Sequence, residues 1–130
     1  MLRRWLATLF GVVAVLLVPW AIYLKLDLSA HHVVRHWDTV WTGYDIALAG
    51  VLLALAVSLV RGLRITPLVA VAAGTMLLCD AWFDTLTSAG GHGLTQAIVG
   101  ALVAEIPLAA ICFWVARFCS YRNPSESRLP

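Results

Sequence analysis

The sequence has few charged residues for its length. Only 12% of its 130 residues are Asp, Glu, Lys or Arg, whereas 62% are hydrophobic and the mean hydropathy is +0.88. A soluble domain usually carries about 25% charged residues. The composition therefore excludes an ordinary soluble domain and predicts an integral membrane protein whose apolar excess faces lipid.

Other absences exclude further classes. The net charge is only +2, the basic residues form no run longer than a pair, and there is no glycine-rich phosphate loop. These features argue against a nucleic-acid partner. The three cysteines contain no C-x-x-C pair and are interpreted as packing residues, not as a zinc site or a disulfide framework: Cys79, Cys112 and Cys119. No sequence motif requires a cofactor.

Four apolar segments are long enough to cross a bilayer, since about 20 helical residues span its hydrocarbon core. They cover residues 5–24, 44–60, 68–87 and 96–115. The first lacks a small-x-small cleavage site, so we interpret it as an uncleaved helix that kinks or ends near Pro19. The sequence predicts an all-α fold: an antiparallel bundle of four transmembrane helices in one domain, residues 1–118, with a flexible tail, residues 119–130.

The connection between the first two spans is the one long polar segment. Apolar residues recur through it and just beyond at the i, i+4, i+7, i+8 and i+11 spacing of a helix face: Val33, Trp37, Val40, Trp41 and Tyr44. We expect a short interfacial amphipathic helix over about residues 30–42, with a bend at Gly43 before the second span. In that span, Gly50, Ala54 and Ser58 are spaced by four, which favours close helix packing.

The basic residues predict the orientation. The sequence has nine of them, and in a four-span topology all but Lys25 and Arg35 fall on one side: Arg3, Arg4, Arg61, Arg64, Arg117, Arg122 and Arg128. Cytoplasmic loops carry an excess of Lys and Arg. We therefore expect a plasma-membrane protein with both termini in the cytoplasm and the histidine-rich connection outside.

Four acids fall inside the expected spans: Asp45, Asp80, Asp84 and Glu105. At about 1.5 Å of rise per residue, Asp45 and Asp84 lie about 5 Å below the outer boundary, Asp80 about 11 Å and Glu105 about 15 Å. An ionised carboxylate in hydrocarbon costs at least about 2.5–3.5 kcal/mol. The acids are therefore expected to face one another and share protons or cations, or to pair with basic residues.

Two local patterns extend this expectation to a pocket that is open outward and closed inward. Asp80 and Asp84 are spaced i, i+4, which puts them on one helix face. Pro107 has no N–H to donate to the carbonyl of Val103, which leaves a backbone acceptor near Glu105. Above the pocket, residues of the polar connection would form a vestibule: His32, Arg35, His36 and Asp38. A metal is not specified, since histidines at an interface are also often simply solvated.

Three functions remain open. The first is a site that binds or moves a cation or protons. The second is a structural or accessory subunit, whose carboxylates pair with basic residues of the chain, of a second copy or of another membrane protein. In that case Asp80 and Glu105 would hydrogen-bond between helices, and Asp45 and Asp84 would be interfacial residues at helix ends. A membrane-embedded enzyme is the third, but no nucleophile–base pair is visible and no catalytic residue is assigned.

The stretches HWDTVWTGYDIALAG and LLCDAWFDTLTSAG, followed by AEIPLA, resemble small four-helix membrane proteins of actinobacterial type. The resemblance covers about residues 30–115 and implies a fold and a type of host, but no activity. Small multidrug transporters are similar in size but carry their essential Glu in the first span, which has no charge here.

Overall fold

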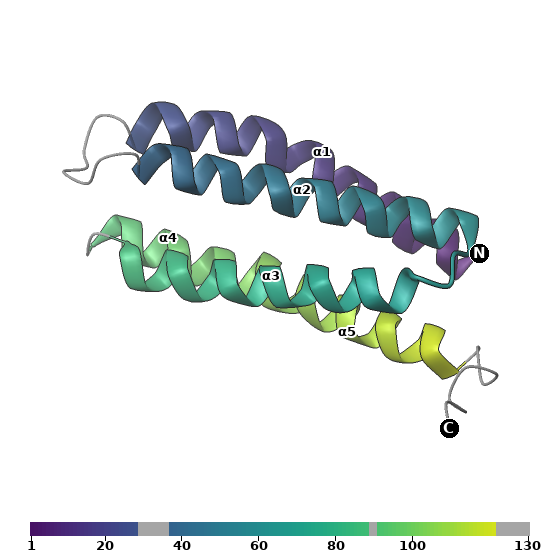
Figure 1. Ribbon diagram of the computed structural model, residues 1–130. Helices are drawn as coiled ribbons and strands as arrows, with labels where there is room; N and C mark the ends of the chain where they lie inside the picture. The colour runs from purple at the N-terminus through teal and green to yellow at the C-terminus, as the bar shows by residue number, and fades with distance from the viewer. Residues whose placement is uncertain (29–36, 89–90, 122–130) are drawn as a thin grey trace, which may run out of the picture. The chain divides into compact units, whose positions relative to one another are not determined.

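The structure, a computed structural model, describes residues 1–28, 37–88 and 91–121, and this part of the chain is helical and contains no strand (Figure 1). Four helices are long and apolar enough to span a membrane: Leu2–Tyr23, Thr39–Arg61, Thr66–Thr87 and His92–Ser120. The all-α class and the four apolar spans expected from the sequence are thus confirmed. The spans begin or end a few residues away from the expected boundaries.

Contacts along the chain divide it into two units, residues 1–62 and residues 63–130. We call them the first and the second hairpin and describe each by itself. The single four-helix domain and its antiparallel bundle stay predictions.

The first hairpin consists of α1 (Leu2–Leu28) and α2 (Trp37–Arg61). The two helices pack side by side along their length (Figure 1). They run antiparallel, because Arg3 near the start of α1 donates from Nη2 to the carbonyl oxygen of Leu59 near the end of α2, at 2.8 Å. The bilayer favours this continuous helical form, since backbone groups in hydrocarbon need partners within their own segment.

Two expected interruptions of these helices are absent. Pro19 lies inside α1, which continues to Leu28, so the helix does not end at the proline. Likewise, α2 passes through Gly43 without a break, and residues 37–42 form its first turns instead of a separate interfacial helix. A glycine costs a helix only about 0.5–1 kcal/mol, which the long apolar helix around it offsets. Residues 30–36 of the expected interfacial helix lie outside the described residues.

Small residues bring α1 and α2 together, but not those expected. A Cβ added to Gly11 of α1 would lie 4.0 Å from Cβ of Ala56. By contrast, Gly50 and Ala54 are exposed, and a Cβ on Gly50 would meet no atom within 4 Å. Gly50 and Ala54 therefore do not form the contact between α1 and α2, and close packing along Gly50, Ala54 and Ser58 stays a prediction. Of the three residues only Ser58 is buried.

The end of α2 shows why Gly62 is a glycine. Its φ is +68°, a left-handed conformation that closes the helix, and its N–H donates to the carbonyl oxygen of Leu59. A Cβ at this position would lie 2.6 Å from Nη2 of Arg3, which caps the same carbonyl. The backbone conformation therefore disfavours a side chain here, and a methyl group would also require the Arg3 guanidinium to move.

We expect Gly62→Ala to destabilise the protein by about 1–3 kcal/mol through backbone strain, with a further loss because the methyl group displaces Arg3. Arg3→Gln, alone and combined with Gly62→Ala, is the control, because the bond from Arg3 to Leu59 can be lost only once. Thermal unfolding in detergent measures the three variants. Strictly additive losses of stability would show that the methyl group does not act through Arg3.

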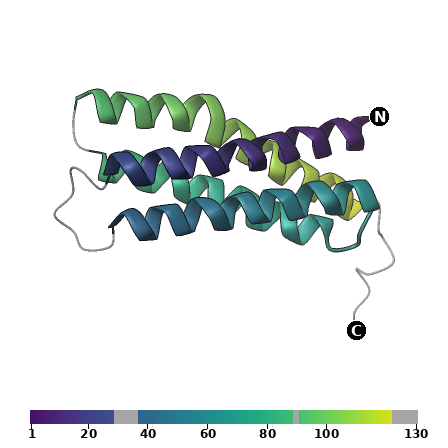
Figure 2. The same cartoon turned by 90° about the horizontal axis from the view of Figure 1, so that it is seen from above.

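The second hairpin begins with α3 (Thr66–Thr87). The chain returns through α4 (His92–Gly100), a π-helical turn η1 (Ala101–Glu105) and α5 (Ile106–Tyr121). Both η1 and α5 pack against α3. The returning segment changes direction between α4 and α5 (Figure 2), as helices do at prolines and π-turns. Cys119 and Ser120 lie in α5, so the expected tail does not begin at residue 119. Residues 122–130 are not among those described.

Gly74 sets the register of the second hairpin. A Cβ added to it would lie 3.0 Å from Cζ of Phe113 and 3.2 Å from Cβ of Cys112. The side chain of Cys112 is fully buried there, in agreement with its interpretation as a packing residue. Gly74 of α3 and Cys112 of α5 are therefore at one level.

Candidate functional site

The register places two acids of the second hairpin next to each other along its length. Asp80 lies six residues after Gly74 on α3, and Ile106 lies six residues before Cys112 on α5. Because the two segments run in opposite directions, Asp80 lies at the level of Ile106, the residue after Glu105. Asp80 and Glu105, which are 25 residues apart in the sequence, thus lie at nearly the same height.

The environment of these acids is largely closed to solvent. Asp80 is only 7% exposed. Asp84 and Glu105 are half-buried, and Oε2 of Glu105 is inaccessible. Asp84 follows Asp80 by one turn of the uninterrupted helix α3, which puts both on one face, as expected. The second hairpin therefore supplies three of the four predicted site acids within a short length.

The π-turn before Pro107 is the local feature that positions Glu105. Proline lacks the N–H for a bond to the carbonyl of Val103, and its ring would collide with that carbonyl in a regular helix. The chain widens instead, and the N–H of Ile106 bonds to the carbonyl oxygen of Ala101, five residues back. The wide turn ends at Glu105. The sequence indicated a helix irregularity near Pro107 but not its form.

Gly100 is a residue of this site that the sequence-based reasoning missed. A Cβ added to it would lie 3.8 Å from Oε1 of Glu105. The carboxylate therefore lies back along the π-turn over a residue without a side chain. A glycine five residues before an intramembrane acid, with a proline two residues after the acid, is the sequence signal that points to this arrangement.

Hydroxyl groups near the end of α3 are engaged by their own helix. Thr85 Oγ1 donates to the carbonyl oxygen of Ala81 at 2.7 Å, and Thr87 Oγ1 donates to that of Phe83 at 2.8 Å. Ser88 Oγ donates to the carbonyl oxygen of Asp84. Such bonds satisfy backbone acceptors in the last turns, so these hydroxyls do not supply donors to the carboxylates.

The fourth predicted acid, Asp45, belongs to the first hairpin and is 4% exposed, with Oδ2 inaccessible. It follows the i, i+4, i+7, i+11 spacing of one α2 face with Ala49, Leu52 and Ala56. Because Ala56 faces Gly11, this stripe faces α1. Thr42, one turn earlier, has a buried Oγ1 without a hydrogen-bond partner in the structure. That Asp45 shares a pocket with the other acids stays a prediction.

The predicted vestibule cannot be compared with the structure in the same way. His32, Arg35 and His36 lie outside the described residues, and for Asp38 only the backbone, in α2, is described. Within residues 1–28, 37–88 and 91–121, no three His, Cys, Asp or Glu side chains lie close enough together to hold a metal ion.

The first hairpin contains a cavity. It is between the start of α1 and the end of α2, and none of the four acids lines it.

The chain matches no protein-family model, no curated protein and no solved structure.

Proposed function

We propose that this chain is a multi-pass membrane protein that binds or moves protons or a cation at the intramembrane carboxylates Asp80, Asp84 and Glu105. The observation that supports this most is the common level of Asp80 and Glu105 in the second hairpin, with Asp80 buried. Two acids at one height inside membrane-spanning helices are costly as separate charges. Together they gain from binding a proton or cation between them.

The chemistry follows from repulsion between close carboxylates. Two such groups cannot both ionise without cost, so a pair binds a proton or a cation more readily than a single exposed acid. Asp84, one turn nearer the end of α3, provides an entry to the pair. Asp45 and the vestibule residues complete this proposal as the sequence predicts: His32, Arg35, His36 and Asp38.

We further propose that both termini are cytoplasmic and that the acids lie in the outer half of the plasma membrane. The hydrogen bond from Arg3 to Leu59 supports this, because it brings Arg3, Arg4 and Arg61 to one end of the first hairpin. A cluster of arginines at one end is typical of the cytoplasmic side.

Ion binding by the purified protein tests the proposed site. We expect Asp80→Asn and Glu105→Gln each to lower the affinity of the site for a proton or a metal cation at least about tenfold. A tenfold change in affinity corresponds to a loss of about 1.4 kcal/mol. Titration of the protein in detergent, with calorimetry for candidate metal cations, measures both. The proposal fails if both variants titrate and bind metals as the wild type does.

An accessory role is the second candidate, and one observation favours it. Four small residues of α2 are exposed at the i, i+4, i+7, i+11 spacing: Gly43, Ala47, Gly50 and Ala54. Such stripes favour close contact between membrane helices. Affinity purification from native membranes discriminates, since recovery only as a homo-oligomer would argue against a partner protein.

A further inference from the structure

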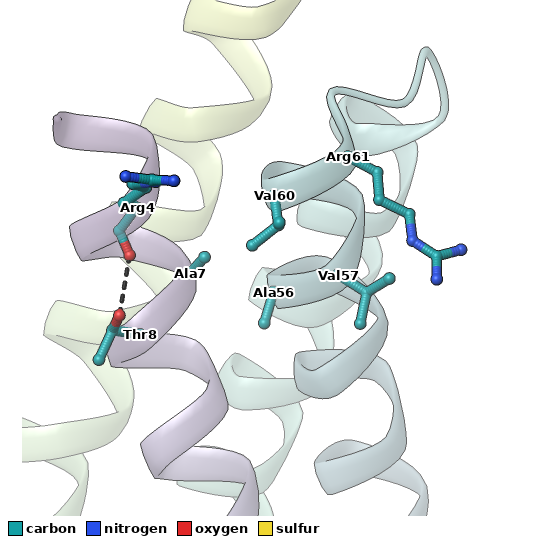
Figure 3. Close-up of a pocket in the computed structure, with 7 residues that line it drawn as sticks. All are labelled: Arg4, Ala7, Thr8, Ala56, Val57, Val60 and Arg61. Atoms are coloured by element: carbon teal, nitrogen blue, oxygen red, sulfur yellow. Dashed lines mark hydrogen bonds between the residues drawn. The ribbon is translucent and has the colours of Figure 1, made fainter.

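The cavity of the first hairpin has a volume of about 490 Å³ and lies between one end of α1 and one end of α2 (Figure 3). Figure 3 shows Ala7, Ala56 and Val60 between the two helices, with Arg4 on α1 and the side chain of Arg61 extending from α2 away from α1. We propose that this cavity binds an anionic phospholipid of the cytoplasmic leaflet. The phosphate would contact Arg4, Arg61 would add attraction from the other side of α2, and an acyl chain would lie along the apolar wall.

The three arginines at this end of the hairpin differ in what they can bind. Arg3 is committed to the carbonyl oxygen of Leu59 and packs over Gly62. Arg4 and Arg61 are exposed, and neither guanidinium forms a hydrogen bond or an ion pair in the described part of the chain. Two cations among the residues that line the cavity, with no carboxylate among the described residues that line it, suit an anionic group.

The wall of the cavity is apolar. Ala7 and Ala56 are small and buried, and their short side chains leave the space. Val57 and Val60 are 39% and 67% exposed and form the side open to lipid. The hydroxyl of Thr8 already donates to the carbonyl oxygen of Arg4 at 2.9 Å, so it adds no polar group for a soluble ligand. Such a wall suits a hydrocarbon chain.

The order of these groups along the membrane normal is that of a phospholipid. Arg4 and Arg61 stand at the ends of their membrane-spanning segments, where headgroups lie. Thr8 and Val57 lie four residues further in, which corresponds to about 6 Å. The charged rim therefore meets the phosphate, and the apolar wall meets the chain below it. Anionic lipids of the cytoplasmic leaflet are attracted to Lys and Arg clusters of this kind.

Native mass spectrometry of the full chain in detergent tests the proposal. The probes are phosphatidylglycerol and phosphatidylcholine with matched acyl chains. We expect phosphatidylglycerol to be retained preferentially, and Arg4→Gln and Arg61→Gln each to weaken its binding about fivefold. Val57→Phe, which fills the cavity from its exposed side and keeps both arginines, should also weaken it. Circular dichroism confirms that each variant is folded.

The control variant is Arg128→Gln, which removes an arginine of the sequence's C-terminal tail and keeps every described residue that lines the cavity. Four results would overturn the proposal: equal retention of the two lipids, an equal loss in Arg128→Gln and Arg4→Gln, wild-type retention by Val57→Phe, or displacement of the lipid by soluble glycerol 3-phosphate at matched concentration. The last result would identify a site for soluble phosphates. The choice of the cytoplasmic leaflet rests on the proposed orientation. Asp45, Asp80, Asp84 and Glu105 do not line the cavity, so lipid binding and ion binding fail independently.

Discussion

Replacing Gly74 by Leu is expected to destabilise the second hairpin by about 3 kcal/mol or more, at or above the upper end for overpacked cores. The Cβ alone would lie 3.0 Å from the ring of Phe113 and 3.2 Å from Cβ of Cys112. The Phe113 ring is 37% exposed and can rotate away. Cβ of Cys112 is fixed to the backbone of α5, so a larger residue can be accommodated only if α3 and α5 separate.

Gly74→Ala should lower the stability less than Gly74→Leu does. The wild type is therefore expected to be the most stable, followed by Gly74→Ala and then Gly74→Leu. Gly50→Leu is the matched control because it makes the same change in a helix where an added Cβ meets no atom within 4 Å. Unfolding in detergent, followed by circular dichroism, measures all three. If Gly74→Leu is as stable as Gly50→Leu, the close approach of α3 and α5 at this point is contradicted.

The second large effect concerns the coupling between Asp80 and Glu105. If these carboxyls share a proton, they titrate as one unit. Removing either carboxyl then changes the pKa of the other by at least about one unit. We therefore expect the effects of Asp80→Asn and Glu105→Gln on proton uptake to be non-additive. The interaction should amount to about 1.4 kcal/mol or more, since one unit corresponds to that energy.

Infrared spectroscopy of the protonated carboxyl bands as a function of pH measures this coupling in the wild type, both single variants and the double variant. Glu126→Gln is the control, since Glu126 is an acid of the polar tail outside the spans. Strictly additive effects would mean that the two acids titrate independently, and the common level of Asp80 and Glu105 would then have no functional meaning.

The sequence predicted the spans well because their signal is local. A run of about 20 apolar residues is long enough to cross a bilayer whatever it packs against. The same locality explains the errors. Pro19 was expected to kink or end a helix and Gly43 to separate two helices, but both lie inside continuous helices, so neither ends one, since in an apolar setting the backbone gains from remaining helical.

The helix contacts were less accessible to sequence reasoning. Gly50, Ala54 and Ser58 have the spacing of a packing stripe, yet the close approach uses Gly11 and Ala56. Both sets consist of small residues in apolar helices. A one-dimensional pattern shows which residues permit contact, but the rotation of each helix about its own axis selects the stripe that is used.

By itself, the sequence determined that this chain is all-α and that four of its segments suit a bilayer, and it predicted four acids as candidates for one site: Asp45, Asp80, Asp84 and Glu105. Only the tertiary structure decided that Asp80 and Glu105 lie at one level, because that depends on the register of two antiparallel segments fixed at Gly74 and Cys112. It likewise decided the π-turn and the arginine-rimmed cavity. Each depends on residues far apart in the chain or on how a helix accommodates a proline, neither of which local hydrophobicity encodes.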